Sequence, residues 1–328
     1  MILNHEELKK IYFGAYSFEE TKDGYLRAFQ YTKAQEEYFR KVENYWYERC
    51  TASTGKTLEM ITCATEFSFD YKIIWQGSLD SFELFADGEF KEEKRIQNLP
   101  VQGTLRFSVQ SREAESASNE EHKQRKITIY LPVDATVVIR NFSLNAPYEI
   151  PSKKEKVLWM GDSITQGYGP LRSSGTYVSV ANRILDYDII NQGIGGYIYD
   201  AGSVMKMEGY TPDKIIVAFG TNQFDTKSLK PVEDFYEKLF LIYGKKIPVI
   251  VITPVWRCDL RSFREENTFI SFCNNLKKVC ERYENITVID GFKLIPHEPE
   301  YYIDNLHPNE EGARIYGEKL AEEIQKLS

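Results

Sequence analysis

The stretch KVLWMGDSITQGYG, residues 156–169, changes character halfway along. Its first five residues are mostly apolar and predict a buried strand. Gly161, Asp162 and Ser163 follow directly in the sequence, and the stretch contains two further glycines, Gly167 and Gly169. Proteins with parallel sheets bind their ligands at the carboxyl ends of the strands. The pattern therefore predicts that a strand delivers the Ser163 hydroxyl to the edge of a sheet.

Length and composition exclude several classes of protein. The 328 residues exceed one ordinary core and suit two domains. With 42% hydrophobic and 27% charged residues, the chain has the composition of a folded globular protein. The 41 Lys and Arg against 49 Asp and Glu give a net charge of −8, which argues against a nucleic-acid partner and against an anionic lipid surface.

The start of the sequence has no signal-peptide pattern, and no apolar run approaches the roughly 18 residues of a membrane span. We therefore expect a cytoplasmic protein with no membrane partner. The five cysteines are odd in number and lack C-x-x-C spacing, so we expect reduced, structural thiols.

Residues 1–150 predict an antiparallel β-sandwich of jelly-roll type. Segments in which apolar and polar residues nearly alternate are separated by short turn signals such as Asp87-Gly88. One helix is expected over 33–42, and the polar run 111–125 is expected to be an exposed loop. The alternating segments are 44–50, 57–63, 66–75, 81–90, 103–110, 126–132 and 135–144.

Residues 151–328 predict an α/β domain. A segment with two prolines and a lysine cluster, 145–156, ends the strand rhythm, and from there apolar strands alternate with longer helical patterns. This alternation implies a parallel sheet between helices, and five strands suit a flavodoxin-like order. The expected strands are 156–160, 187–191, 214–219, 247–253 and 286–290, and the expected helices are 174–186, 198–208, 231–244, 263–284 and 309–327.

Four polar or glycine-rich clusters follow strands of this second domain. They are GDS at 161–163, NQGIGGY at 191–197, FGTNQF at 219–224 and DNLHP at 304–308. Each cluster alone has an ordinary explanation, as a turn, a helix cap or a close strand–helix contact. Together they are expected to meet at one edge of one sheet, which indicates a catalytic site.

A serine hydroxyl needs a base to remove its proton before it can attack an acyl group, and histidine suits this task because its ordinary pKa is about 6.5. Of the four histidines, His5 is expected in an N-terminal tail and His122 in the charged loop. His307 has Asp304 three residues earlier, a spacing that lets the carboxylate accept the proton on Nδ1 and leaves Nε2 free for Ser163. His297 is the second candidate, with glutamates nearby but without that spacing.

The same reaction needs hydrogen-bond donors for the negative charge that develops on the carbonyl oxygen. Backbone N–H groups in glycine-rich turns are suitable donors because no Cβ blocks close approach. The N–H groups of Gly196 and Ser163 and the side-chain amide of Asn222 are the candidates.

The motifs GDSIT, NQGIGGY, GTN and DNLHP stand in the order expected of SGNH hydrolases, also called the GDSL esterase family, over residues from about 155 to 328. This resemblance implies Ser163 as nucleophile, Gly196 and Asn222 as oxyanion donors, and His307 as the base that Asp304 orients. GIGG holds three glycines, and the family's N-x-G-x-x-G spacing points to Gly196. Ile-Thr follows the serine where many relatives have leucine. The N-terminal half resembles the β-sandwich that precedes the hydrolase domain in carbohydrate esterase family 2 and in related acyl esterases and acyltransferases.

Other motifs are absent. CTASTGKT at 50–57 lacks the first glycine of a phosphate loop and is interpreted as a hairpin turn. There is no G-x-S-x-G elbow, no H-E-x-x-H and no G-x-G-x-x-G after a strand, so we expect neither a metal nor another cofactor.

The substrate is the least determined part of the prediction. Side chains in or beside the edge loops could contact it, although with 14% aromatic residues several would fall there by chance; they are Tyr168, Tyr197, Gln223, Phe224 and Trp256. No long apolar lid is visible, which favours a short acyl group on a polar carrier. We therefore expect a serine esterase that removes short acyl groups, acetyl first of all, from a carbohydrate or glycoside through an acyl-enzyme. The alternatives are an acyltransferase, a lipase or thioesterase, and a catalytically idle glycan-binding protein. The role of the sandwich and the formation of a homo-oligomer stay open.

Overall fold

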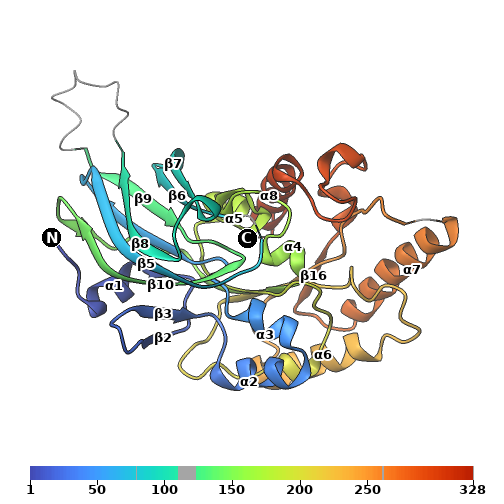
Figure 1. Ribbon diagram of the computed structural model, residues 1–328. Coiled ribbons are helices and arrows are strands. Elements are labelled where there is room, and N and C mark those ends of the chain that lie inside the picture. The colour runs from blue at the N-terminus through green and yellow to red at the C-terminus, as the bar shows by residue number, and fades with distance from the viewer. Residues whose placement is uncertain (79, 110–122, 261, 328) are drawn as a thin grey trace.

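The computed structural model describes residues 1–78, 80–109, 123–260 and 262–327 (Figure 1). Its strands form three sheets, two antiparallel ones within the first 149 residues and a parallel one further along. His122, most of the predicted loop 111–125 and the end of the predicted strand 103–110 lie outside the described residues.

The two antiparallel sheets confirm the N-terminal part of the fold prediction. One has the order β1-β4-β9-β6-β7, with β11 beside β4, and the other has the order β2-β3-β10-β5-β8. Their inner faces share one core, in which Phe69 of β5 contacts Phe142 of β10 and also Phe82 of the opposite sheet. The strands are β1 (Tyr12–Phe13), β2 (Ser17–Glu20), β3 (Leu26–Phe29), β4 (Thr57–Thr62), β5 (Glu66–Gln76), β6 (Ser81–Ala86), β7 (Glu89–Arg95), β8 (Gln102–Ser108), β9 (Arg125–Tyr130), β10 (Ala135–Leu144) and β11 (Tyr148–Glu149).

The third sheet has the order β13-β12-β14-β15-β16, and all its strands are parallel. This is the flavodoxin-like order that the sequence predicts, and the five strands start within two residues of their expected positions. They are β12 (Lys156–Gly161), β13 (Asp188–Gly193), β14 (Lys214–Ala218), β15 (Val249–Ile252) and β16 (Ile286–Ile289).

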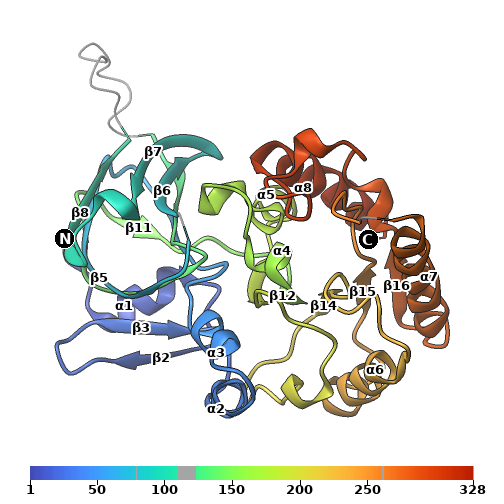
Figure 2. The ribbon, with the colours of Figure 1, turned by 45° about the vertical axis from the view of Figure 1, so that its right-hand side comes forward.

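Helices cover both faces of the parallel sheet (Figure 2). On β12, Val157 and Trp159 point into the core formed with α5 (Tyr177–Leu185) and α8 (Glu310–Gln325). Leu158 and Met160 point the other way, into the core formed with α6 (Lys230–Tyr243) and α7 (Phe263–Cys280). Alternate residues of a strand face opposite sides, so an unbroken apolar run is required where both faces are covered. The short elements are α4 (Ser163–Gln166), η1 (Ile96–Asn98), η2 (Ser173–Gly175), η3 (Ala201–Ser203), η4 (Gly291–Lys293) and η5 (Pro299–Tyr301).

Two helices from the N-terminal half pack on the parallel-sheet part of the molecule. They are α2 (Lys33–Val42) and α3 (Asn44–Cys50), and Figure 2 shows them below the junction of the two halves. Phe39 and Cys50 are fully buried in the core that α6 and α7 form with the sheet. The N-terminal half therefore supplies part of the core on the α6 and α7 side of the parallel sheet, called the second core below.

The prediction of a strand over 44–50 is wrong, since these residues form α3. The aromatic run YWY resembles a strand, but Trp46 and Cys50 lie four residues apart and turn one helical face toward Tyr197 and the shared core. It follows that 50–57 connects a helix to a strand, the reverse of the order in a phosphate loop, and is not a hairpin turn.

The expected helix over 198–208 is reduced to the single turn η3. The Asp200 carboxylate accepts hydrogen bonds from the Gly202 N–H and from the hydroxyls of Tyr38 and Tyr197, which fixes a loop in place of a helix. The start of the chain is also more ordered than expected, because His5 lies in α1 (His5–Ile11) and not in a tail.

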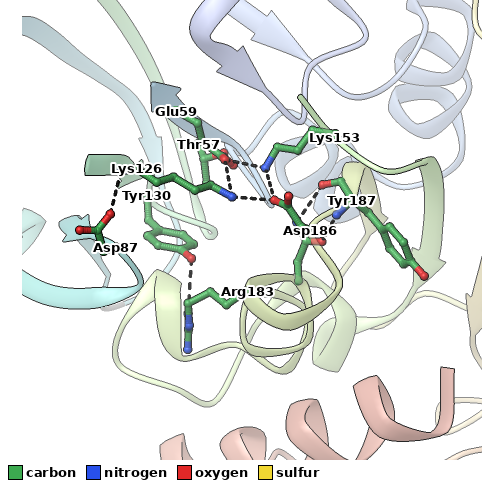
Figure 3. Close-up of polar contacts among 10 residues, drawn as sticks. Thr57, Glu59, Asp87, Lys126, Tyr130, Lys153, Arg183, Asp186 and Tyr187 are labelled. Atoms are coloured by element: carbon green, nitrogen blue, oxygen red, sulfur yellow. Dashed lines mark hydrogen bonds and ion pairs between the residues drawn. The ribbon is translucent and has the colours of Figure 1, made fainter. Parts of the chain in front are cut away.

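An alternating set of charges joins the sandwich to the parallel-sheet part (Figure 3). The Nζ atom of Lys153 lies 2.5 Å from Glu59 and 3.2 Å from Asp186, which ends α5. Lys126 of β9 lies 2.6 Å from Asp186 and 3.8 Å from Glu59. Each half thus contributes one lysine and one carboxylate, and both lysines contact both carboxylates.

Within the described residues, no helix is both long and apolar enough to pass through a membrane. The five cysteines are unpaired thiols.

Candidate active site

Ser163 lies in the first turn of α4, directly behind β12. Asp162 caps this helix, because its Oδ1 accepts the Ile164 N–H at 3.0 Å. Gly161 is required by space, since a Cβ there would lie 2.0 Å from Oγ1 of Thr165. The GDSIT sequence therefore encodes a strand end, a cap and a tight helical turn, in that order.

Ser163, His307 and Asp304 form a chain of hydrogen bonds. The Oγ atom of Ser163 lies 2.8 Å from Nε2 of His307, and Nδ1 of the same ring lies 2.7 Å from Oδ2 of Asp304. The other carboxylate oxygen of Asp304 accepts the backbone N–H groups of Leu306 and His307, at 3.1 and 2.8 Å. Asp304 is thereby held in the turn that carries the histidine, with one oxygen left for the ring.

Two effects act on the pKa of Asp304. Partial burial raises it, but the hydrogen bonds from the backbone and ring of His307 and from the Leu306 N–H outweigh burial and lower the pKa below its ordinary value. The ionised carboxylate can only accept, so it favours the ring tautomer with a proton on Nδ1 and a free Nε2 facing Ser163.

The loop behind α4 lies against the histidine turn. Tyr168 contacts the His307 ring edge-on, with the ring centroids 4.7 Å apart. Gly169 has φ +123°, and a Cβ there would lie 2.1 Å from the Pro308 carbonyl oxygen. Only glycine fits this close approach, which brings Tyr168 over the ring.

The predicted oxyanion donors line the same cavity as Ser163 and His307. Gly196 has φ +71°, a left-handed conformation that favours glycine. Among the hydrogen bonds of the described residues, the N–H groups of Ser163 and Gly196 have no partner. The Asn222 side-chain amide donates one hydrogen to the Tyr197 carbonyl at 2.9 Å and has a second hydrogen to offer.

The cavity has a volume of about 450 Å³, and both halves of the chain line it. Tyr45 and Arg49 come from α3, Gly77 and Ser78 follow β5, and Asp134 precedes β10. None of these five residues was predicted to lie in the site, because no motif marks them and residues 44–50 were expected to form a strand. Gln166, three residues after Ser163 on the same short helix, also lines the cavity, and its i, i+3 spacing was a signal that could have found it.

Of the side chains predicted to contact substrate, Tyr168 lines this cavity and the other four do not. Tyr197 is buried and hydrogen-bonds Asp200, and Gln223 accepts the Tyr199 N–H. Phe224 packs on Phe269, and Trp256 stacks on His297. His297 contacts the rings of Trp256 and Phe292 and does not line this cavity.

A larger hollow of about 960 Å³ lies on the sandwich, between residues of β5, β7 and β8, and contains none of the predicted catalytic residues. In the part of the chain that the structure describes, no cluster of His, Cys, Asp or Glu side chains could hold a metal ion.

Residues 159–315 match the GDSL-like Lipase/Acylhydrolase family. The matched residues cover most of the parallel-sheet part of the chain, and that part is similar to this family. The resemblance to SGNH (GDSL) hydrolases is thereby confirmed, and the GDSL-like domain contains every residue of the Ser163–His307–Asp304 chain. No curated protein matches the sequence.

Solved structures share the two-part architecture of this chain. A salicylyl-acyltransferase from a tetracycline biosynthetic pathway is 17% identical with a TM-score of 0.72, over 96% of this chain and 94% of that one. A putative GDSL-like lipase from Bacteroides ovatus is 18% identical with a TM-score of 0.70, over 100% and 97%. A family two carbohydrate esterase from Clostridium thermocellum is 15% identical with a TM-score of 0.63, over 84% and 93%. At such identities the likeness shows the fold.

Proposed function

We propose that this GDSL-like protein is a serine esterase in which Ser163 is the nucleophile, His307 the base and Asp304 the group that orients it. The observation that carries the proposal is the pair of hydrogen bonds, 2.8 and 2.7 Å long, from Ser163 through the His307 ring to Asp304. Such an arrangement activates a hydroxyl that is otherwise a weak nucleophile near neutral pH.

The reaction follows from these positions. Nε2 of His307 takes the Ser163 proton while Oγ attacks the ester carbonyl carbon, and the resulting oxyanion is bound by the N–H groups of Ser163 and Gly196 and by the Asn222 amide. His307 then gives the proton to the leaving alcohol, and an acyl-enzyme remains. Water enters, loses a proton to His307 and attacks the acyl carbon. The bond between the acyl carbon and Oγ then breaks, His307 returns the proton to Oγ, and the acid leaves.

We further propose that the substrate is a short acyl ester, acetyl first of all, of a carbohydrate or glycoside. The cavity is small, and its lining includes the Arg49 guanidinium, a group that donates hydrogen bonds to sugar hydroxyls. Tyr45 also lines the cavity; the Arg49 guanidinium covers one face of its ring at 3.4 Å, which leaves the other face for stacking on a sugar. The fold shared with a family two carbohydrate esterase agrees with this choice.

An acyltransferase is the second candidate, because the fold is also shared with a salicylyl-acyltransferase over 96% of this chain. The acyl-enzyme is the same, and only the second alcohol differs. Product analysis with an added polyol acceptor separates the two, since transfer gives a new ester at the expense of free acid.

The substrate test is a series of nitrophenyl esters of increasing chain length, run beside acetylated oligosaccharides. We expect the highest kcat/KM on the acetyl ester and release of acetate from the sugar. A preference for long chains with no acetate from any sugar would reject the carbohydrate substrate and favour a lipase or thioesterase. A glycan-binding protein without activity would bind sugar equally well after Ser163→Ala.

Residues 1–150 and 151–328 are, in this proposal, the sandwich domain and the catalytic domain, with α2 and α3 attached to the second core. A cytoplasmic location stays a prediction from the sequence.

A further inference from the structure

A buried glutamine, Gln166, connects the loop of Gly195 and Gly196 to the sandwich through two hydrogen bonds. The Gly195 N–H donates to Oε1 of Gln166 at 2.7 Å, and Nε2 of the same amide donates to Oδ1 of Asp134 at 2.7 Å. Gln166 lies on the catalytic helix α4, whereas Asp134 lies between β9 and β10 of the sandwich. The two bonds connect the glycine loop, the helix of the nucleophile and the other half of the chain.

We propose that Asp134 is a positioning residue for the reaction, acting through the Gln166 amide to hold the Gly195–Gly196 loop with its N–H toward the oxyanion. This inference rests on the proposed esterase function. It gives the sandwich a part in catalysis that does not depend on contact with the substrate.

Polarity makes the tie specific. The Gly195 N–H can only donate, and Oδ1 of Asp134 accepts, so the Gln166 amide fits in one of its two orientations. Burial raises the pKa of Asp134, while the hydrogen bonds from Ser78 and Gln166 and the charge of Arg49 favour its ionised form. The Gln166 and Asp134 side chains are buried, with residue exposures of 3% and 6%, so water does not readily replace a lost bond.

The loop needs such a tie because it is built from two consecutive glycines. Glycine has more backbone freedom than any other residue, and Gly196 carries one of the proposed oxyanion donors at φ +71°. The hydrogen bond at Gly195 restrains the peptide unit next to that donor. A loop that is free to rotate would meet the oxyanion with its N–H misdirected, which costs rate rather than substrate binding.

Asp134 is itself fixed at several atoms. Its N–H donates to Oδ2 of Asp80 at 2.8 Å, its carbonyl accepts the Gly77 N–H at 2.8 Å, and Ser78 donates to its carboxylate. Asp80 in turn accepts the Ser173 hydroxyl at 2.5 Å, from the catalytic half. The carboxylate that orients Gln166 is thus anchored to both halves of the molecule.

The test first replaces the donor that Gln166 presents to Asp134 by an acceptor, and then supplies a donor at position 134. Gln166→Glu keeps the acceptor for Gly195 but sets two carboxylates about 2.7 Å apart, and Asp134→Asn supplies an amide that can donate to the new carboxylate. Losing one oxyanion donor typically lowers turnover by about 10²–10³-fold. At a pH where both carboxylates are ionised and share no proton, we expect Gln166→Glu to lower kcat on nitrophenyl acetate by about 10–100-fold with KM nearly unchanged, and Gln166→Glu combined with Asp134→Asn to recover most of the loss.

Two further variants keep the test decisive. Gln35→Glu is the matched control, because Gln35 is equally buried and donates to the Ser203 carbonyl, outside the cavity. It should lose stability and keep kcat per folded molecule. If Gln166→Glu does not fold, Gln166→Met removes both bonds without adding charge and should show the same fall in kcat.

Failure of the inference and failure of the esterase function give different results. An active wild type whose kcat survives Gln166→Glu or Gln166→Met within twofold, or a double variant no better than Gln166→Glu, overturns the role of Asp134 alone. A wild type that neither hydrolyses any ester nor reacts with an organophosphonate at Ser163 overturns the proposed function itself.

Discussion

Nε2 of His307 lies 2.8 Å from Oγ of Ser163, although 144 positions separate the two residues along the chain. They meet because β12 ends directly before the serine, and the turn before α8 brings the histidine to the same edge of the parallel sheet. In this geometry the third member, Asp304, decides which ring nitrogen carries the proton.

Asp304→Asn should therefore lower kcat by about 10²–10⁴-fold with little change in KM. The new amide can donate to Nδ1, which favours the tautomer with its proton on Nε2, the wrong side for accepting from Ser163. The measurement is steady-state kinetics on nitrophenyl acetate, with folding checked by circular dichroism. A kcat within threefold of the wild type would show that Asp304 does not orient the base.

Asn222→Ala should lower kcat by about 10²–10³-fold if its amide binds the oxyanion. The variant also loses the hydrogen bond to the Tyr197 carbonyl, worth about 1 kcal/mol. Asn182→Ala is the control, because the Asn182 amide donates to the Tyr187 carbonyl at 3.0 Å and does not line the catalytic cavity. Equal losses of kcat in the two variants would mean that Asn222 acts through stability alone.

Much of this candidate site could be predicted from the sequence, because its residues stand in short motifs, three of them close after apolar strands and the fourth in the turn before α8. The runs at β12 and β14 are unbroken because both sheet faces are covered, and that signal is local. The triad residues and Gly196 follow from motif order and from the few histidines available.

What could not be predicted depends on contacts between distant segments. Arg49 and Asp134 enter the cavity only because α3 and the turn before β10 pack against the catalytic half, and no local pattern marks such a contact. The aromatic run at 45–47 is too short to distinguish a strand from a helix by its pattern. The contact of Trp46 with Tyr197, which belongs to a distant segment, favours the helix α3. The sequence places Tyr197 and Trp256 in loops at the edge of the sheet, yet in the structure both side chains pack against other rings.

Glu59→Gln should destabilise the junction between the two halves. The side chains of Glu59 and Lys153 are each 7% exposed, and removal of one partner from a buried pair typically costs about 3–5 kcal/mol. Asp186 still faces Lys153, so we expect about 3 kcal/mol from urea unfolding. Glu37→Gln breaks the exposed pair with Lys41 and should change stability by less than about 0.5 kcal/mol. Similar losses in the two variants would contradict a buried ionic junction.

The free energy of unfolding should fall as the pH rises from about 4 to 7. Burial raises the pKa of Asp162 to about 7, against the hydrogen bond from the Ile164 N–H and the charge of Arg257, and burial likewise raises the pKa of Asp80 to about 7. The folded state binds more protons than the unfolded state in this window, so stability decreases with pH up to about 7. Above about pH 7 the buried Lys56 acts in the opposite sense, because burial lowers its pKa to about 7 and the unfolded state then binds more protons. The lowered pKa of Asp304 acts in the opposite sense and only below about pH 4.

Asp162→Asn keeps an oxygen for the helix cap and removes the titration. Urea unfolding of the wild type and of this variant at intervals from pH 4 to 8 isolates the contribution of Asp162 as the difference between the two curves. That difference should change steadily up to about pH 7 and then stay constant. A difference that is flat over the whole range would show that Asp162 does not titrate there.

Reaction with a fluorophosphonate, followed by peptide mapping, tests whether Ser163 is an activated nucleophile. We expect a single phosphonylated peptide that contains Ser163, loss of esterase activity in proportion to labelling, and no labelling of Ser163→Ala or His307→Ala. Label on another residue, or an esterase activity that survives in Ser163→Ala, would contradict the proposed mechanism.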